Sequence, residues 1–309
     1  MNTREITVLA VGGTGESYPD DTRTTVSGML SSVTDALDDR FTARWVPYPA
    51  SYGPVSGRDA DCYRLSVARG VANLSAAIDA ASGSGEHPVM LIGYSQGAVV
   101  IRTLLSHPSA ERLRSRIAAV GFVADPHQPP GVVPGCDGWG VAGPGPAIPE
   151  DVPAYWVGTP DDVICNASPD SLIRDLADLT GTLSARHLPE WLSDAAARAF
   201  GAATQNATST RIAPQQWRRD VHRLLTAARE AGGWLPRGLG MIRNPLGGRH
   251  VSYASEPYGH APLTDPDVTG CEDLAHWLQV QATLGLHDEP FTALPHPPAH
   301  PPAHLPGAA

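Results

Sequence analysis

Residues 88–105 read PVMLIGYSQGAVVIRTLL. The apolar run at the start is typical of a buried strand, and the apolar run after residue 97 is typical of a buried helix. Between them, residues 93–97 form the pattern G-x-S-x-G in the strand–turn–helix context of a nucleophile elbow. The two glycines allow the strand and the helix to approach closely, and the strained turn pushes the serine hydroxyl out of the sheet. The stretch predicts Ser95 as a nucleophile; the alternative is a tight turn around a buried serine.

Outward from this stretch, segments of strand type alternate with segments of helix type, which predicts a parallel sheet. The other expected strands lie at 6–11, 41–46, 117–123 and 154–158, and the other expected helices at 22–37, 61–81 and 271–284. Between 169 and 232 the pattern predicts only helices, near 171–179, 189–200 and 214–231. We therefore expect an α/β protein with a central parallel sheet, flanking helices and a helical insertion.

These patterns divide the chain into four parts. Residues 1–166 are the first part of the core, 167–248 a helical insertion or linker subdomain, 249–290 the last part of the core, and 291–309 a Pro/His-rich tail expected to be disordered. Inserted helices of this kind line the substrate entrance in hydrolases, where specificity for large substrates resides. The alternative is that these helices only stabilise the sheet.

The composition excludes several functional classes. The 309 residues carry a net charge of −10, which argues against nucleic acid or an anionic membrane surface as the main partner. No apolar run is long enough to span a bilayer, and a strand begins soon after Met1, so we expect neither integral membrane association nor a signal peptide. The four cysteines show no C-x-x-C spacing, so no metal site is expected.

A serine hydroxyl becomes nucleophilic when a base takes its proton and an acid orients that base. In α/β hydrolases the acid and then the base follow the serine along the chain, each near the carboxyl end of a strand. The candidate acids here are Asp125, Asp161 and Asp162. The last two follow a later strand, where the acid usually lies, and Asp162 is preferred, with Asp161 as the first alternative.

Five of the histidines that follow Ser95 are candidate bases. His250 and His260 precede the last helix, which is the usual place for the base, and His250 is preferred. His187 and His222 fall inside the insertion. His276 lies within the last helix, where a packed or solvated histidine is the simpler interpretation.

A glycine-rich loop, GGTGES at residues 12–17, follows the first expected strand. It lacks the lysine of a P-loop and the register of G-x-G-x-x-G, which disfavours phosphate binding. An acyl-transfer site needs a backbone amide that faces the serine from a neighbouring strand end. This loop is the best candidate to supply that amide.

Together, GTGE at 13–16, GYSQG at 93–97, Asp162 followed by Cys165, and a late histidine resemble the cutinase-like serine esterases of the α/β hydrolase fold. Within this family the chain is most similar to the lysin B class, phage esterases that separate mycolic acids from arabinogalactan. The features behind this are the expected lack of a signal peptide, the insertion between acid and base, and the His-x-x-Tyr pattern at 250–253. The resemblance covers about residues 5–285.

The resemblance implies that Ser95 is the nucleophile, Asp162 the acid and His250 the base, with the backbone amides of Gln96 and Thr14 as oxyanion donors. It implies no metal and no organic cofactor, and a monomer acting on mycolic-acid esters of arabinogalactan or on other lipid esters. Such a protein is made in the host cytoplasm and acts at the host envelope during lysis.

One departure from the family concerns the acid loop. Cutinases have a cysteine on each side of the acid, whereas only Cys165 is present here, so their loop disulfide is expected to be absent. Two other functions remain open. One is a general cutinase-like lipase or polyester hydrolase of an actinobacterium, and the other is an inactive hydrolase fold that binds cell-wall lipid.

Overall fold

The computed structural model describes residues 5–57, 59–82, 88–107, 110–181, 217–233, 248–260 and 265–285. The helix expected at 189–200, His187 and the tail at 291–309 lie outside these residues. Within the described part, no helix combines the length and apolar character that crossing a membrane requires.

Five parallel strands form one sheet in the order β2-β1-β3-β4-β5. They are β1 (Ile6–Val11), β2 (Phe41–Trp45), β3 (Val89–Tyr94), β4 (Ile117–Val123) and β5 (Ala154–Val157). The central strand β3 is buried along its whole length, as expected for an unbroken apolar run in a sheet covered on both faces. In the register of β1 and β3, Val11 pairs with Gly93, so the loops after these two strands begin side by side.

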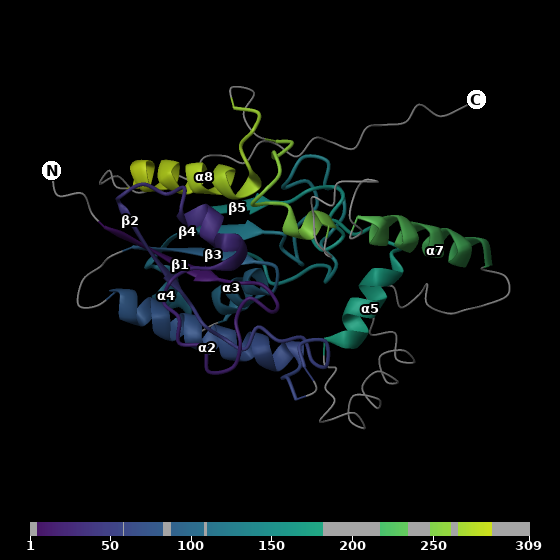
Figure 1. Ribbon diagram of the computed structural model, residues 1–309, viewed down its shortest axis with the longest axis horizontal. Coiled ribbons are helices and arrows are strands. Elements are labelled where there is room, and N and C mark those ends of the chain that lie inside the picture. Colours follow the sequence, from purple (N-terminus) through teal and green to yellow (C-terminus); the bar gives the residue numbers. More distant parts are fainter. Residues whose placement is uncertain are drawn as a thin grey trace.

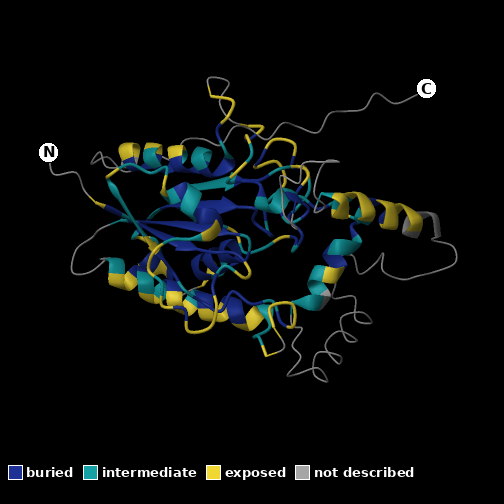
Figure 2. Cartoon of the chain, in the orientation of Figure 1, coloured by how far each residue is buried: buried dark blue, intermediate teal, exposed yellow. Residues whose placement is uncertain are grey.

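Helices cover both faces of the sheet (Figure 1). One face packs against α2 (Tyr63–Ser82) and α3 (Gln96–Ser106), with the short α4 (Glu111–Arg114) beside α2. The other face packs against α8 (Gly270–Gly285), η1 (Gly28–Leu30) and α1 (Ser31–Thr34). Figure 2 shows the result: the central strands β1, β3 and β4 are mostly buried and the edge strands β2 and β5 are partly exposed. The exposed residues of α2 and α8 lie on their outer sides.

Between β5 and α8, the described residues include α5 (Leu172–Thr180), α7 (Trp217–Gly232) and η4 (Gly248–Val251). Helices α5 and α7 project to one side of the sheet (Figure 1). They are joined by the buried ion pair between Arg223 and Asp175 and by Glu230, whose carboxylate accepts from the Ser168 amide at 2.8 Å. The helical character expected before the last helix is therefore present in the described residues.

The helix expected at 22–37 is wrong for most of its length, because only 28–34 are helical. The preceding residues form an extended loop, in which the Thr24 carbonyl accepts from the Trp45 amide at 2.8 Å. The Arg23 side chain holds the loop by donating to the Glu16 carbonyl and to Asp21. These tertiary contacts and the β-branched run at 24–26 outweigh the helical spacing of the apolar residues.

Candidate active site

Ser95 lies in the sharp turn between β3 and α3. Its φ of 51° and ψ of −113° place a non-glycine residue in a sparsely populated backbone region. A Cβ at Gly97 would lie 1.9 Å from the Val11 carbonyl oxygen, and one at Gly93 would lie 2.8 Å from the Ala98 amide nitrogen. Both positions therefore require glycine. This elbow at the end of the central strand, in a parallel sheet with helices on both faces, defines an α/β hydrolase fold, and the predicted fold class is confirmed.

The structure brings Ser95, His250 and Asp162 into one chain of contacts. His250 Nε2 lies 3.0 Å from Ser95 Oγ, and His250 Nδ1 lies 3.0 Å from Asp162 Oδ2. The serine follows β3, the aspartate lies in the loop after β5, and the histidine lies on η4. The Asp162 side chain is fully buried, whereas the His250 side chain is 12% exposed. Such an arrangement can remove a proton from the serine and carry the resulting charge on the imidazole.

Two further donors fix the Asp162 carboxylate. Tyr253 donates its hydroxyl to Asp162 Oδ2 at 2.8 Å, and the Ile164 amide donates to Oδ1 at 3.0 Å. Burial raises the pKa of Tyr253 well above its ordinary value, so its hydroxyl keeps its proton at neutral pH. The sequence contained Tyr253 only as part of a pattern. It lies in the turn that follows η4, three residues after the base, and no local pattern indicated its contact with the acid.

Tyr94 orients the histidine from the other side. Its ring stacks on the His250 imidazole with centroids 5.1 Å apart and planes 29° apart. Its hydroxyl donates to the His250 carbonyl at 2.8 Å. Because Tyr94 directly precedes Ser95, the elbow positions both the serine and one support of the base.

Thr14 and Gln96 lie beside each other, and Thr14 Oγ1 donates to Gln96 Oε1 at 3.3 Å. The buried Gln96 side chain also accepts from the Tyr48 hydroxyl at 3.4 Å and donates to the Ser51 carbonyl at 3.1 Å. Within the described ranges, the backbone amides of Thr14 and Gln96 donate to no protein acceptor. The Gln96 amide also lies at the positive end of α3. Both amides are therefore available to an incoming oxygen.

The other candidate acids are placed differently. Asp125 is fully buried and pairs with Arg102 Nε at 2.7 Å, and it also accepts from Trp156 Nε1 at 3.0 Å. These contacts hold the start of the loop after β4. Asp161 is exposed, one residue before Asp162. The carboxylate that His250 Nδ1 contacts is that of Asp162.

The other candidate bases within the described residues have different surroundings. His260 is exposed, and its ring meets the edge of the Tyr258 ring. His222 and His276 are exposed on α7 and α8. Of the histidines in the described part of the chain, His250 is the one that contacts Ser95.

The four cysteines are free thiols; Cys136, Cys165 and Cys271 are buried and Cys62 is half-buried. Cys165 packs beside the acid, because its thiol lies 3.5 Å from the Asp162 carbonyl and 3.6 Å from the Tyr253 hydroxyl. Burial raises the pKa of the Cys165 thiol well above its ordinary value. Among the described residues no cluster of three His, Cys, Asp or Glu side chains could hold a metal ion.

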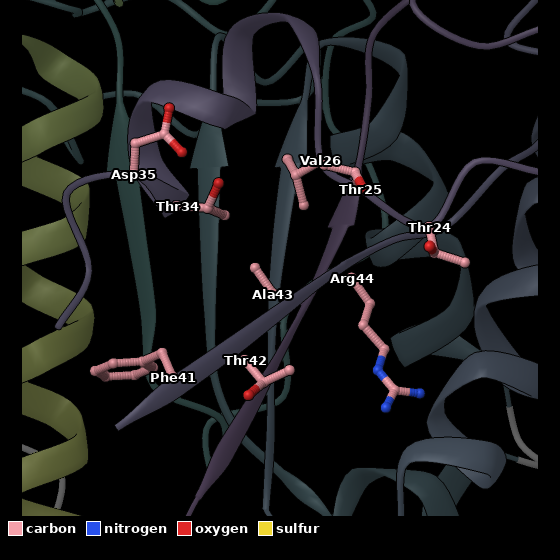
Figure 3. Close-up of a pocket in the computed structure, with 9 residues that line it drawn as sticks. All are labelled: Thr24, Thr25, Val26, Thr34, Asp35, Phe41, Thr42, Ala43 and Arg44. Atoms are coloured by element: carbon pink, nitrogen blue, oxygen red, sulfur yellow. The ribbon is translucent and has the colours of Figure 1, made fainter. Parts of the chain in front are cut away.

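A cavity of about 560 Å³ lies at the outer edge of β2 (Figure 3). Its walls come from the loop before η1, from α1 and from β2, and include Thr24, Asp35, Thr42 and Arg44. None of the residues around Ser95 lines it. This cavity is therefore separate from the site where the serine, histidine and aspartate meet.

The comparisons with known proteins cover parts of the chain. The family described as PE-PPE domain matches residues 40–163, less than half of the chain; the matched stretch contains Ser95 and Asp162 and ends before His250. No curated protein matches.

Several solved structures are similar to the chain. A cutinase-like protein from Cryptococcus sp. is 16% identical over 62% of this chain and 88% of its own, with a TM-score of 0.40. The catalytic core domain of an acetyl xylan esterase from Trichoderma reesei is 18% identical over 63% and 98%, with a TM-score of 0.40. A Trichoderma reesei cutinase in complex with a phosphonate inhibitor is 23% identical over 62% and 73%, with a TM-score of 0.36. Because these scores are low, the fold assignment rests on the strand order and the elbow.

Proposed function

We propose that this chain is a serine hydrolase of carboxylic esters. The observation that carries the proposal is the chain of contacts from Ser95 through His250 to the buried Asp162, formed at a strained elbow. The resemblance of the sequence motifs to cutinase-like serine esterases supports the same chemistry.

In the proposed reaction, Ser95 Oγ attacks the ester carbonyl carbon while His250 Nε2 takes the hydroxyl proton. Asp162 holds the imidazole in the tautomer that accepts this proton and stabilises the imidazolium. The amides of Thr14 and Gln96 donate to the oxygen that becomes negative. Collapse of the intermediate releases the alcohol, which leaves with the proton from His250. Water then attacks the acyl-enzyme with His250 as base, and the acid product leaves.

For the substrate, we propose long-chain lipid esters, and in particular the ester between mycolic acids and arabinogalactan in the cell envelope, as in lysin B. The resemblance in the sequence supports this, and so do the helices between acid and base. Three leucines of these helices are more than half exposed: Leu176 on α5 and Leu224 and Leu225 on α7. Exposed apolar side chains on the helices between acid and base suit a lipid substrate. A general cutinase-like esterase or lipase is the second candidate, favoured by the catalytic contacts alone.

The test is hydrolysis of p-nitrophenyl butyrate and p-nitrophenyl palmitate, together with release of free mycolic acids from purified mycobacterial cell wall. The proteins are the wild type, Ser95→Ala, and Ser106→Ala as a control, because Ser106 is exposed at the end of α3. The proposal expects turnover in the wild type and in Ser106→Ala, and its loss in Ser95→Ala.

The outcomes separate the candidates. Ester turnover together with release of mycolic acids supports the lysin B type. Turnover without mycolic acid release contradicts that type and leaves the general esterase. If the wild type hydrolyses none of the esters, the proposal of a serine hydrolase is contradicted, and a lipid-binding module is favoured.

A further inference from the structure

Glu16 lies in the same loop as Thr14, and the proposed mechanism gives its carboxylate no role. Its Oε2 accepts from the Gly13 amide at 2.7 Å, and its Oε1 accepts from the Met29 amide at 2.7 Å. The first amide directly precedes Thr14 in the loop after β1. The second lies in η1, on the far side of the following loop. One side chain therefore ties the loop after β1 to a separate element of the fold.

Two glycines leave the space that this carboxylate occupies. A Cβ at Gly28 would lie 2.3 Å from Glu16 Oε1, and a Cβ at Gly12 would lie 2.9 Å from Oε2. Gly28 also has a φ of +68°, which is natural for glycine and costly for other residues. Gly12 and Gly28 therefore leave room for the Glu16 carboxylate because they carry no side chain.

The hydrogen bonds of the Glu16 carboxylate and of the neighbouring amides restrain the backbone on both sides of Thr14. Beyond the bond to the Gly13 amide, the Glu16 amide donates to the Gly13 carbonyl at 3.1 Å, and the Gly15 amide donates to the Ala50 carbonyl at 2.8 Å. The amides before and after Thr14 are thus engaged by the protein, whereas the Thr14 amide has no acceptor within the described ranges. The direction of the Thr14 amide is set by these neighbours.

The carboxylate is held at an electrostatic cost. Burial raises the pKa of Glu16, and the bonds from Met29 and Gly13 and the charges of His250 and Arg23 oppose this increase only in part. The native state therefore disfavours the ionised carboxylate relative to the unfolded chain. The Glu16 carboxylate thus destabilises the native state when it is ionised, yet it binds the amide next to Thr14. This combination points to a role other than stability.

We propose that Glu16 is a positioning residue for the oxyanion hole: its carboxylate, by binding the Gly13 and Met29 amides, aims the Thr14 amide at the substrate oxygen. The proposal rests on the proposed ester hydrolysis. Glu16 acts through the loop and does not contact the reacting atoms. Glu16 therefore stabilises the transition state, in which the substrate oxygen carries the negative charge.

The test compares Glu16→Gln with Asp20→Asn. Both variants remove one negative charge near the loop, but Asp20 is exposed and its carboxylate accepts no hydrogen bond within the described residues. An amide side chain offers one acceptor oxygen in place of two, so Glu16→Gln can keep only one of the two backbone amides. The readouts are kcat and KM for p-nitrophenyl butyrate, inhibition by a boronic acid that forms a tetrahedral adduct with the serine, and the melting temperature.

We expect kcat of Glu16→Gln to fall by about 10- to 100-fold, because removing an oxyanion donor outright costs about 100- to 1,000-fold. KM should change little, and boronic acid affinity should fall together with kcat/KM. The melting temperature should stay close to that of the wild type, because loss of the buried charge offsets loss of one hydrogen bond. Asp20→Asn should match the wild type in every readout.

Two results would overturn the role of Glu16. One is a kcat for Glu16→Gln equal to that of Asp20→Asn, and the other is a loss of kcat with unchanged boronic acid affinity. If Glu16→Gln does not fold, Glu16→Asp keeps the charge and shortens the reach, and the same kcat and affinity losses are expected of it. An inactive wild type would instead overturn the ester hydrolysis itself, so the two failures are distinguishable.

Discussion

At the scale of single residues, the site depends on a backbone conformation that most side chains avoid. Ser95 adopts a positive φ of 51°, which costs on the order of 1–3 kcal/mol. The surrounding contacts compensate: its amide donates to the Val123 carbonyl at 2.9 Å, and α3 begins at the next residue. The strain is useful because it points the hydroxyl at His250 and away from the sheet.

Asp162→Asn tests the assignment of the acid. The amide that replaces the carboxylate can donate to His250 Nδ1 and so favours the tautomer that cannot accept the serine proton. We expect kcat to fall by about 1,000- to 10,000-fold, measured on p-nitrophenyl butyrate. Asp161→Asn, one residue earlier and exposed, is the matched control and should keep nearly full activity. Equal losses in the two variants would contradict the assignment.

Tyr253→Phe tests the support of the acid. It removes the hydroxyl that donates to Asp162 Oδ2 and keeps the buried ring. A hydrogen bond to a charged group contributes about 1.5–3 kcal/mol, so we expect kcat to fall by about 10- to 100-fold. The control is Tyr155→Phe, which removes a hydroxyl that donates to Asp273 at 2.7 Å, away from the serine. A kcat in Tyr253→Phe as high as in this control would show that the Tyr253 hydroxyl does not support the acid.

At the scale of elements, the sequence predicts strands better than it predicts loops. The strands at 6–11 and 117–123 match the structure because each is a mostly apolar run that is buried on both faces. The segment at 22–37 carries apolar residues at helical spacing, yet Arg23 and the bond from the Trp45 amide to the Thr24 carbonyl hold its first part in a loop. Local periodicity does not show these contacts. The contacts of Tyr253 and Glu16 join residues from different loops. They depend on how the sheet brings those loops together, and periodicity in the sequence does not describe this.

Gly97→Ala tests the close packing of the elbow. The new Cβ would lie 1.9 Å from the Val11 carbonyl oxygen, so α3 or β1 must move. We expect a loss of about 3 kcal/mol of unfolding free energy, measured by urea unfolding followed by circular dichroism. The control is Gly232→Ala at the end of α7, where a Cβ meets nothing within 4 Å. A stability for Gly97→Ala that matches the control would contradict the close approach of strand and helix at the elbow.

The loop between β1 and η1 should be sensitive to acid. Arg23 and Ser17 donate to the buried Asp21 carboxylate and hold its pKa far below its ordinary value of 3.8. A lowered pKa stabilises the native state above about pH 4, and this stabilisation is lost as the pH falls through the lowered pKa. We therefore expect Asp21→Asn to have a lower melting temperature than the wild type at pH 7, with a difference that shrinks below pH 4.

The matched control for this loop is Asp38→Asn. Asp38 pairs with Arg40 at the same spacing, but both side chains are partly exposed. Exposed ion pairs contribute about 0–1 kcal/mol, so this variant should melt close to the wild type at pH 7. A difference between Asp21→Asn and the wild type that stays constant from pH 7 to pH 3 would show that ionisation of Asp21 is not the cause.

At the scale of the whole molecule, the sheet gathers residues that are far apart in the chain. Ser95 lies in the turn after β3, Asp162 in the loop after β5 and His250 on η4, and the contacting atoms are 3.0 Å apart in each pair. Helices α5 and α7 come between the acid and the base in the sequence and project beside the sheet (Figure 1). The core thus supplies the residues of the proposed chemistry, and we expect the helices between acid and base to influence the choice of substrate.

The central claim is that Ser95 is a nucleophile activated by His250. The most direct measurement is labelling of the folded protein with an alkyl fluorophosphonate, followed by intact mass and peptide mapping. We predict one adduct, on Ser95, absent in Ser95→Ala, formed at the wild-type rate in Ser106→Ala, and formed at least about 100-fold more slowly in His250→Gln. Labelling of another residue, or an unchanged rate in His250→Gln, would contradict the claim.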